Sequence, residues 1–202
     1  MYKKYIAEFI GTYCLSLVVL LAVNMRGPLP IAVPLIAGFT LMIFVYTLGS
    51  ISGSHINPAV TLGLLSVKKI SLKDAGGYIV AQLLGGLLSI VLVGRVLDIT
   101  LKAVRTGAFS SGIFFAEALG MFFFTFGIAS VVYGKTKEQM SGLVVGGSLL
   151  LGIMIASFSG ALGILNPAVA VALGATTFVY LLAPIVGSVA GFWAYKWMSD
   201  SK

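Results

Sequence analysis

Charged residues are scarce in this sequence. Asp, Glu, Lys and Arg make up 9% of the 202 residues, whereas soluble domains contain roughly 25%. Hydrophobic residues reach 59%, so a soluble globular protein and a disordered chain are both excluded. A helix that spans a bilayer needs about 20 apolar residues, and the chain has room for about six such helices. The sequence therefore predicts an all-α integral membrane protein with a single domain, residues 1–202.

Cysteine and histidine each occur only once, as Cys14 and His55. One residue of each type cannot build a disulfide framework or a zinc cluster. With a single histidine, a Ser-His-Asp catalytic triad is also poorly supported, and the sequence shows no motif that pairs a nucleophile with a base. We therefore expect no metal, no cofactor and no enzymatic activity.

Acidic residues are outnumbered by basic ones, 6 to 13, which gives a net charge of +7. The basic residues are scattered in short polar gaps instead of forming a stripe interleaved with aromatic residues, so we expect no nucleic-acid partner. A six-span arrangement places nine of them on one side, namely Lys3, Lys4, Lys68, Lys69, Lys73, Lys135, Lys137, Lys196 and Lys202, and four on the other, namely Arg26, Arg95, Lys102 and Arg105. The positive-inside rule then predicts that both termini are cytoplasmic, and we expect the plasma membrane as the location.

Long apolar runs are plentiful and are separated by short polar or breaker-rich segments. The expected spans are about residues 5–25, 31–49, 75–97, 112–133, 140–158 and 178–198. Small residues recur four positions apart in several of these runs, for example at Gly142 and Gly146. In lipid this spacing indicates faces where helices approach closely.

Two copies of Asn-Pro-Ala-Val stand out, at residues 57–60 and 166–169. Proline suits the first position of a helix, and the asparagine before it suits the N-cap. The helices that follow, about residues 59–66 and 168–176, are only about 12 Å long at ~1.5 Å per residue, less than half of a ~30 Å hydrocarbon core. The sequence thus predicts two re-entrant half-helices that meet, asparagine to asparagine, at the membrane midplane.

The two motifs belong to a longer internal repeat. Asn57 and Asn166 lie 109 positions apart, and the same spacing separates Glu8 from Glu117 and Gly11 from Gly120. We expect repeat 1 at about residues 1–97 and repeat 2 at about 112–202. Each repeat contains three spans and a half-span, so the second is inverted in the membrane and a pore forms between the two.

The paired Asn-Pro-Ala motifs, the first within Ser-Gly-Ser-His-Ile-Asn-Pro-Ala-Val, resemble those of the aquaporin and aquaglyceroporin family. The resemblance covers nearly the whole chain and implies six membrane helices with two half-helices. It also implies a passive channel for water and small neutral solutes such as glycerol, assembled as a homotetramer with one pore per protomer. The pore motif would consist of Asn57, Pro58, Ala59, Asn166, Pro167 and Ala168.

Three ionisable residues are expected near this motif. Glu8 and Glu117 lie within apolar spans, where an ionisable group suggests function. In the resembled family the matching glutamates accept hydrogen bonds from the re-entrant backbone, and we expect this anchoring role in preference to a proton or ion relay. His55 is expected to hold its loop or to line the pore mouth, in preference to acting as a pH gate.

The main departure from the family pattern follows the second motif. Most relatives have Arg there, whereas this chain has Val169. Gap-free alignment from the asparagines places the other constriction residues at Ala37, Met154 and Gly163. None of the four side chains can donate a hydrogen bond. We therefore expect a constriction that is wider and more apolar than a strict water filter, or alternatively one that dewets and closes.

Two other classes of function remain open at this point. A secondary transporter also uses inverted repeats and broken helices, and a saturable, concentrative flux would favour it. A closed-pore membrane protein with a structural or adhesion role would leave the osmotic swelling of liposomes unchanged. The two buried glutamates are the only groups here that suit ion coupling.

Overall fold

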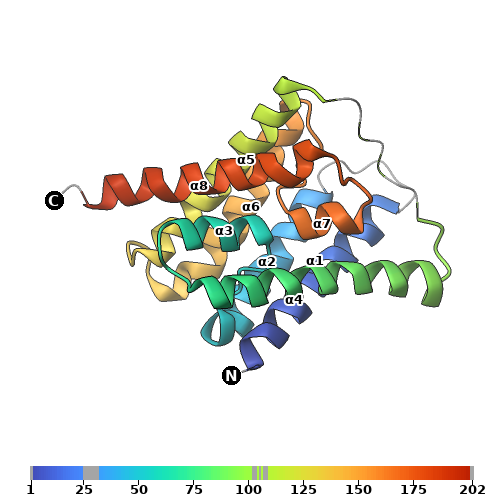
Figure 1. Cartoon of the computed structure of the whole chain (residues 1–202), viewed down its shortest axis with the longest axis horizontal. Coiled ribbons are helices and arrows are strands. Elements are labelled where there is room, and N and C mark those ends of the chain that lie inside the picture. Colours follow the sequence, from blue (N-terminus) through green and yellow to red (C-terminus); the bar gives the residue numbers. More distant parts are fainter. Residues whose placement is uncertain (1, 25–31, 102–103, 105, 107–108, 201–202) are drawn as a thin grey trace.

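Helices account for all the regular structure in the described part of the computed structural model, which comprises residues 2–24, 32–101, 104, 106 and 109–200. The α-helices are α1 (Lys3–Asn24), α2 (Ala32–Ser52), α3 (Pro58–Ser66), α4 (Leu72–Val91), α5 (Ser111–Val132), α6 (Ser141–Phe158), α7 (Pro167–Ala172) and α8 (Phe178–Asp200) (Figure 1). A π-helical turn, η1 (Leu92–Val96), extends α4, and a 3₁₀ turn, η2 (Glu138–Met140), precedes α6. The all-α fold class predicted from the sequence is confirmed.

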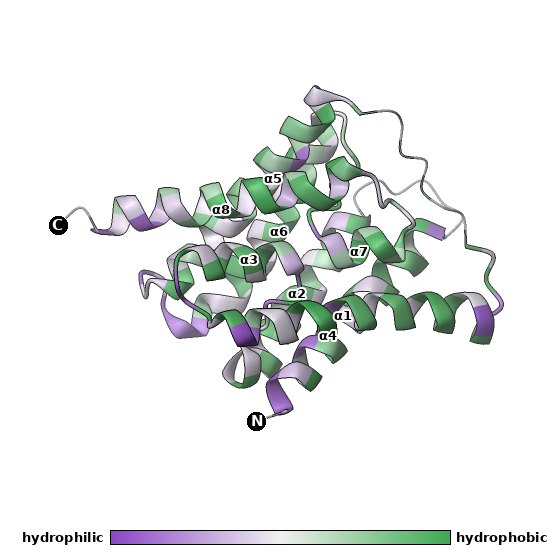
Figure 2. Ribbon diagram, in the orientation of Figure 1, coloured by the Kyte–Doolittle hydropathy of each residue, from purple (hydrophilic) through white to green (hydrophobic). Residues whose placement is uncertain are grey.

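Six of the helices in this part of the chain are long and apolar enough to cross a membrane. Their outer faces carry exposed large apolar side chains such as Phe39, Phe115 and Leu151. Hydrophilic residues gather at helix ends and in the connections (Figure 2). This is the surface that a hydrocarbon solvent requires, and the chain is an integral membrane protein.

The second half-helix is shorter than expected. Helix α7 ends at Ala172, whereas the sequence pattern predicted about Thr176. Leu173 forms its C-cap, and Gly174 has a φ of +70°, a left-handed conformation that commonly stops a helix. The prediction for the first half-helix, which ends at Ser66, is confirmed.

Helix contacts come in pairs that relate the two halves. Helix α1 packs on α2 and α4, as α5 packs on α6 and α8, while α2 and α6 pack on each other. The half-helices cross over: α3 packs on α8, and α7 packs on α4. Each half-helix is thus held partly by the opposite half of the chain, as an inverted repeat requires.

Glycine permits two of these close approaches. A Cβ atom on Gly38 of α2 would lie 2.8 Å from the carbonyl oxygen of Gly146 on α6. A Cβ atom on Gly86 of α4 would lie 2.7 Å from the carbonyl oxygen of Ala168, in the first turn of α7. Small residues therefore bring backbones together between α2 and α6 and beside the second half-helix.

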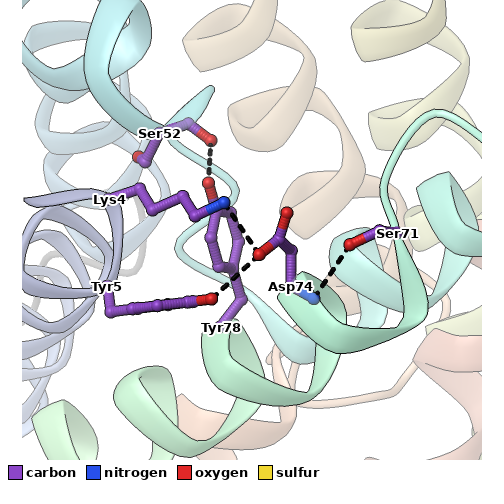
Figure 3. Close-up of polar contacts among 6 residues, drawn as sticks. All are labelled: Lys4, Tyr5, Ser52, Ser71, Asp74 and Tyr78. Atoms are coloured by element: carbon purple, nitrogen blue, oxygen red, sulfur yellow. Dashed lines mark hydrogen bonds and ion pairs between the residues drawn. The ribbon is translucent and has the colours of Figure 1, made fainter. Parts of the chain in front are cut away.

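A polar joint connects the N-terminal ends of α1 and α4 (Figure 3). Asp74 accepts a hydrogen bond of 2.8 Å from the Tyr5 hydroxyl, and its carboxylate lies 2.7 Å from Lys4 Nζ. Four residues along α4, the Tyr78 hydroxyl donates to the carbonyl oxygen of Ser52 over 2.7 Å. The joint thus fixes the end of α2, from which the first re-entrant segment, residues 53–56, starts.

Candidate functional site

The two asparagines form the N-caps of the half-helices. Asn57 has extended backbone, and its Oδ1 accepts a hydrogen bond of 2.8 Å from the Ala59 N–H. Asn166 does the same for Ala168 and Val169, over 3.0 and 3.4 Å. Pro58 and Pro167 follow the caps and begin α3 and α7. The positive ends of two helix dipoles therefore lie at the asparagines.

The same asparagines also brace each other's loop. Asn57 Nδ2 donates to the carbonyl oxygen of Leu165 over 2.9 Å, and Asn166 Nδ2 donates to that of Ile56 over 2.9 Å. Ile56 and Leu165 have φ values of +52° and +54°, unusual for bulky residues. Such strain persists where surrounding contacts fix it, and both side chains are fully buried. The reciprocal pair thus joins the two halves of the chain through two hydrogen bonds.

Glu8 holds the first re-entrant segment. Its carboxylate accepts from the backbone N–H of His55 over 2.9 Å and of Ile56 over 2.6 Å. The Ser52 hydroxyl and the Gln82 amide donate to it over 2.7 and 2.8 Å. Sequence reasoning did not assign a role to Gln82, although a polar amide side chain within an apolar span indicates that it has a hydrogen-bond partner there.

Glu117 holds the second re-entrant segment, residues 159–165, with three backbone contacts. It accepts from the N–H groups of Gly163, Ile164 and Leu165 over 2.7, 3.2 and 3.0 Å. Helix bonding cannot satisfy these N–H groups, because their residues precede α7, and hydrocarbon offers no alternative partner. Among the described contacts, Glu117 receives backbone donors only, whereas Glu8 also receives two side chains.

His55 belongs to the first re-entrant segment, and its ring makes two side-chain contacts. Its Nδ1 is 3.1 Å from the Thr61 hydroxyl oxygen, and its ring packs edge to face on Tyr78 with the centroids 5.0 Å apart. Among the residues that the structure describes, no group of three His, Cys, Asp or Glu side chains is placed to hold a metal ion.

A cavity of about 150 Å³ lies on one side of the asparagine pair. Helices α1, α2, α5, α6 and α7 and both re-entrant segments contribute to its wall. The lining residues are Leu15, Val19, Val23, Val33, Ala37, Leu41, His55, Ile56, Asn57, Val104, Phe124, Leu149, Ile153, Leu162, Gly163, Ile164, Asn166, Val169 and Leu173. Sequence reasoning missed the contributions of α1 and α5, although Leu15, Val19 and Val23 recur at the helical spacing of four.

Three of the four expected constriction residues line this cavity, namely Ala37, Gly163 and Val169. Met154 does not, and the preceding residue, Ile153, takes its place. Adjacent residues on a helix point about 100° apart, so an error of one position turns the side chain to another face. Gap-free counting back from Asn166 into α6 thus reaches the residue next to the one that lines the cavity.

The fold and this geometry define a class of protein. Two opposed half-helix ends meet between inverted halves of a six-helix bundle, and a cavity opens onto their asparagines. This is the architecture of a membrane channel for uncharged solutes, because helix N-termini at the midplane repel cations.

Comparisons with known proteins identify the family. The family model of the major intrinsic protein matches residues 1–195. Aquaporin NIP1-1 of Arabidopsis thaliana is 32% identical over 220 residues, covering 96% of this chain and 73% of the relative. Glycerol uptake facilitator protein-like 6 of Lactiplantibacillus plantarum is 34% identical over 204 residues, covering 93% and 94%. The X-ray structure of the Plasmodium falciparum aquaglyceroporin superposes with a TM-score of 0.74 at 26% identity, covering 98% and 96%.

The chain therefore belongs to the major intrinsic protein family. It is a passive membrane channel for water and small solutes and not an enzyme. The predictions of family, fold and channel function are confirmed, and this favours a channel over the secondary transporter and the closed-pore adhesion protein.

Proposed function

We propose that this channel conducts neutral solutes of the size of glycerol at a rate comparable to or above that of water. The observation that carries the proposal is the outer constriction, which we assign to Ala37, Ile153, Gly163 and Val169. None of these side chains is charged or donates a hydrogen bond. The similar proteins include a relative named as a glycerol uptake facilitator and a solved aquaglyceroporin, and both names support glycerol-sized solutes.

We assign selection against ions to the asparagine pair. The amide nitrogen of Asn57 and that of Asn166 each carry a second N–H beyond the one used in the reciprocal brace. These groups can donate to a hydroxyl or water oxygen, and the two half-helix dipoles oppose a cation at the same place. In this proposal Glu8, Glu117 and His55 hold the loops that carry the asparagines, and Pro58, Ala59, Pro167 and Ala168 form the first turns behind them.

Stopped-flow light scattering of reconstituted vesicles tests the proposed solute range. Under a glycerol gradient, vesicles with the protein should reswell at least several-fold faster than protein-free vesicles, and an impermeant osmolyte should report water flux alone. Fast water flux without glycerol flux would contradict the wide constriction. If neither moves, the apolar lining dewets and the pore is closed.

We further propose a homotetramer in which each protomer has its own pore. The proposal rests on family resemblance and on the exposed apolar faces of the long helices, which neighbouring protomers can cover. Native mass spectrometry from mild detergent should give a mass of about four chains. A monomer, both in detergent and in lipid particles, would contradict the assembly.

We also propose that both termini face the cytoplasm at the plasma membrane. Lys69 lies over the ring of Tyr133, 4.6 Å from its centroid, which brings the loop after α3 to the same end as Lys135 and Lys137. Arg26, Lys102, Arg105 and Lys202, which also entered the charge count, lie outside the described residues. A fluorescent protein that matures only in the cytoplasm, fused to the C-terminus, should fluoresce at the cell periphery. A fusion that does not fluoresce would contradict the proposed orientation and place the C-terminus on the other side of the membrane.

A further inference from the structure

The polar groups of the cavity are distributed unevenly. Nineteen described residues line it, and among them only His55, Asn57 and Asn166 have polar side chains. All three belong to the re-entrant segments or their half-helix caps, so they mark the inner end of the cavity. Towards the outer end the described lining residues are aliphatic or aromatic, including Val23 near the end of α1 and Val33 near the start of α2.

The volume of the cavity limits what can occupy it. A volume of about 150 Å³ corresponds to the share of roughly five water molecules in the liquid. Phe124, Leu149 and Ile153 supply an apolar wall here, and each is at most 5% exposed.

The inner end of the cavity offers hydrogen-bond donors. The Oδ1 atoms of Asn57 and Asn166 are engaged with the first turns of their own half-helices, and one amide N–H of each is engaged with the opposite loop. The remaining amide N–H groups and the positive helix ends favour an acceptor atom on the solute. A solute oxygen is therefore stabilised at this end, whereas a second hydroxyl against the walls has no side-chain partner among the described lining residues.

We infer that the channel selects neutral solutes that carry a hydrogen-bond acceptor at one end and a short apolar tail at the other, in preference to solutes that are polar at both ends. The inference rests on the proposed function, because it assigns the direction in which a solute of glycerol size lies in the pore. The acceptor contacts Asn57 and Asn166, and the tail lies among Val19, Phe124 and Ile153.

Matched pairs of solutes test this selection in stopped-flow measurements on reconstituted vesicles. Propylene glycol differs from glycerol by one hydroxyl, and acetamide differs from urea by a methyl group in place of an amino group. The rate in protein-free vesicles is subtracted for each solute, since the less polar members also cross lipid faster. The protein-dependent permeability should be about fivefold higher or more for propylene glycol and for acetamide, the effect of leaving one polar group unpaired in apolar surroundings.

A substitution in the cavity wall separates the effect of the wall on solute preference from the effect of the asparagines. Val169→Thr has nearly the same volume but adds a hydroxyl to the cavity, so the preference for propylene glycol over glycerol should shrink at least twofold. Val186→Thr is the matched control, because Val186 is 53% exposed on the outer face of α8, and it should leave the ratio unchanged.

The outcomes distinguish the inference from the proposed function. Glycerol flux that equals or exceeds that of propylene glycol overturns the inference and leaves the proposed function standing. Fast water flux with no protein-dependent flux of any of these solutes overturns both. A preference that Val169→Thr and Val186→Thr alter equally shows that the cavity wall is not its source.

Discussion

Replacing Asn166 with Asp is expected to break the brace between the two halves and to admit cations. In the structure Asn166 Nδ2 donates to the carbonyl oxygen of Ile56 over 2.9 Å. A carboxylate places a second acceptor against that oxygen, leaves it without a donor, and should cost about 1–3 kcal/mol of the free energy of unfolding. The helix ends keep the carboxylate ionised, and its charge removes the barrier to cations. Asn57→Asp should act in the same way on Leu165.

Two measurements at pH 8 check this expectation. Thermal unfolding in detergent reports the loss of stability, and conductance across a planar bilayer reports cation passage. Asn24→Asp is the matched control: Asn24 donates to the carbonyl oxygen of Leu20 within α1 and does not line the cavity. If both pore variants fold, conduct neutral solutes at the original rate and exclude cations, the asparagines are not the filter.

The fold could be predicted from the sequence because a bilayer permits few alternatives. Backbone groups in lipid must be satisfied internally, so each apolar run of about 20 residues indicates a helix. The second Asn-Pro-Ala motif lies 109 residues after the first, and Glu8 and Glu117 share this spacing. The repeat then predicts two half-helices and the inversion of the second half. The end of α7 was less predictable, since a glycine inside a short apolar segment does not indicate by itself whether it stops the helix.

The contacts of the site were only partly predictable. Repeat spacing places Glu8 and Glu117 at equivalent positions, which suggests equivalent partners. The reciprocal brace instead depends on left-handed backbone at Ile56 and Leu165, and neither residue type favours that conformation. The surroundings over-determine it through the glutamates and the opposite asparagine, and such tertiary effects leave no local pattern in the sequence.

The cavity wall shows a second limit of reasoning from spacing. Counting from Asn166 reaches α6 across the re-entrant segment 159–165, and one residue more or less there changes which side chain faces inward. Ile153 is 5% exposed and lines the cavity, whereas Met154 does not. The cavity wall is aliphatic at this point, since Ile153, like Met154, carries no hydrogen-bond donor.

Val169 is the position where we expect an inserted charge to change most the size of the solutes that the channel admits. Its side chain is 4% exposed and lines the cavity beside the N-terminal turn of α7. An arginine there occupies much of a cavity of about 150 Å³ and presents five N–H donors in a rigid fork. Val169→Arg should therefore lower glycerol permeability at least tenfold and affect water much less, because a single-file water needs far less room.

Val169→Met separates volume from charge in this experiment. Methionine also reaches into the cavity but is flexible and uncharged, so it should reduce glycerol permeability only a few-fold. Stopped-flow light scattering under glycerol and impermeant-osmolyte gradients gives the ratio of the two permeabilities for each variant, and elution as a single detergent-solubilised species checks that each one folds. An unchanged ratio in a folded Val169→Arg channel would show that the constriction lies elsewhere along the pore. Equal losses in the arginine and methionine variants would assign the effect to volume alone.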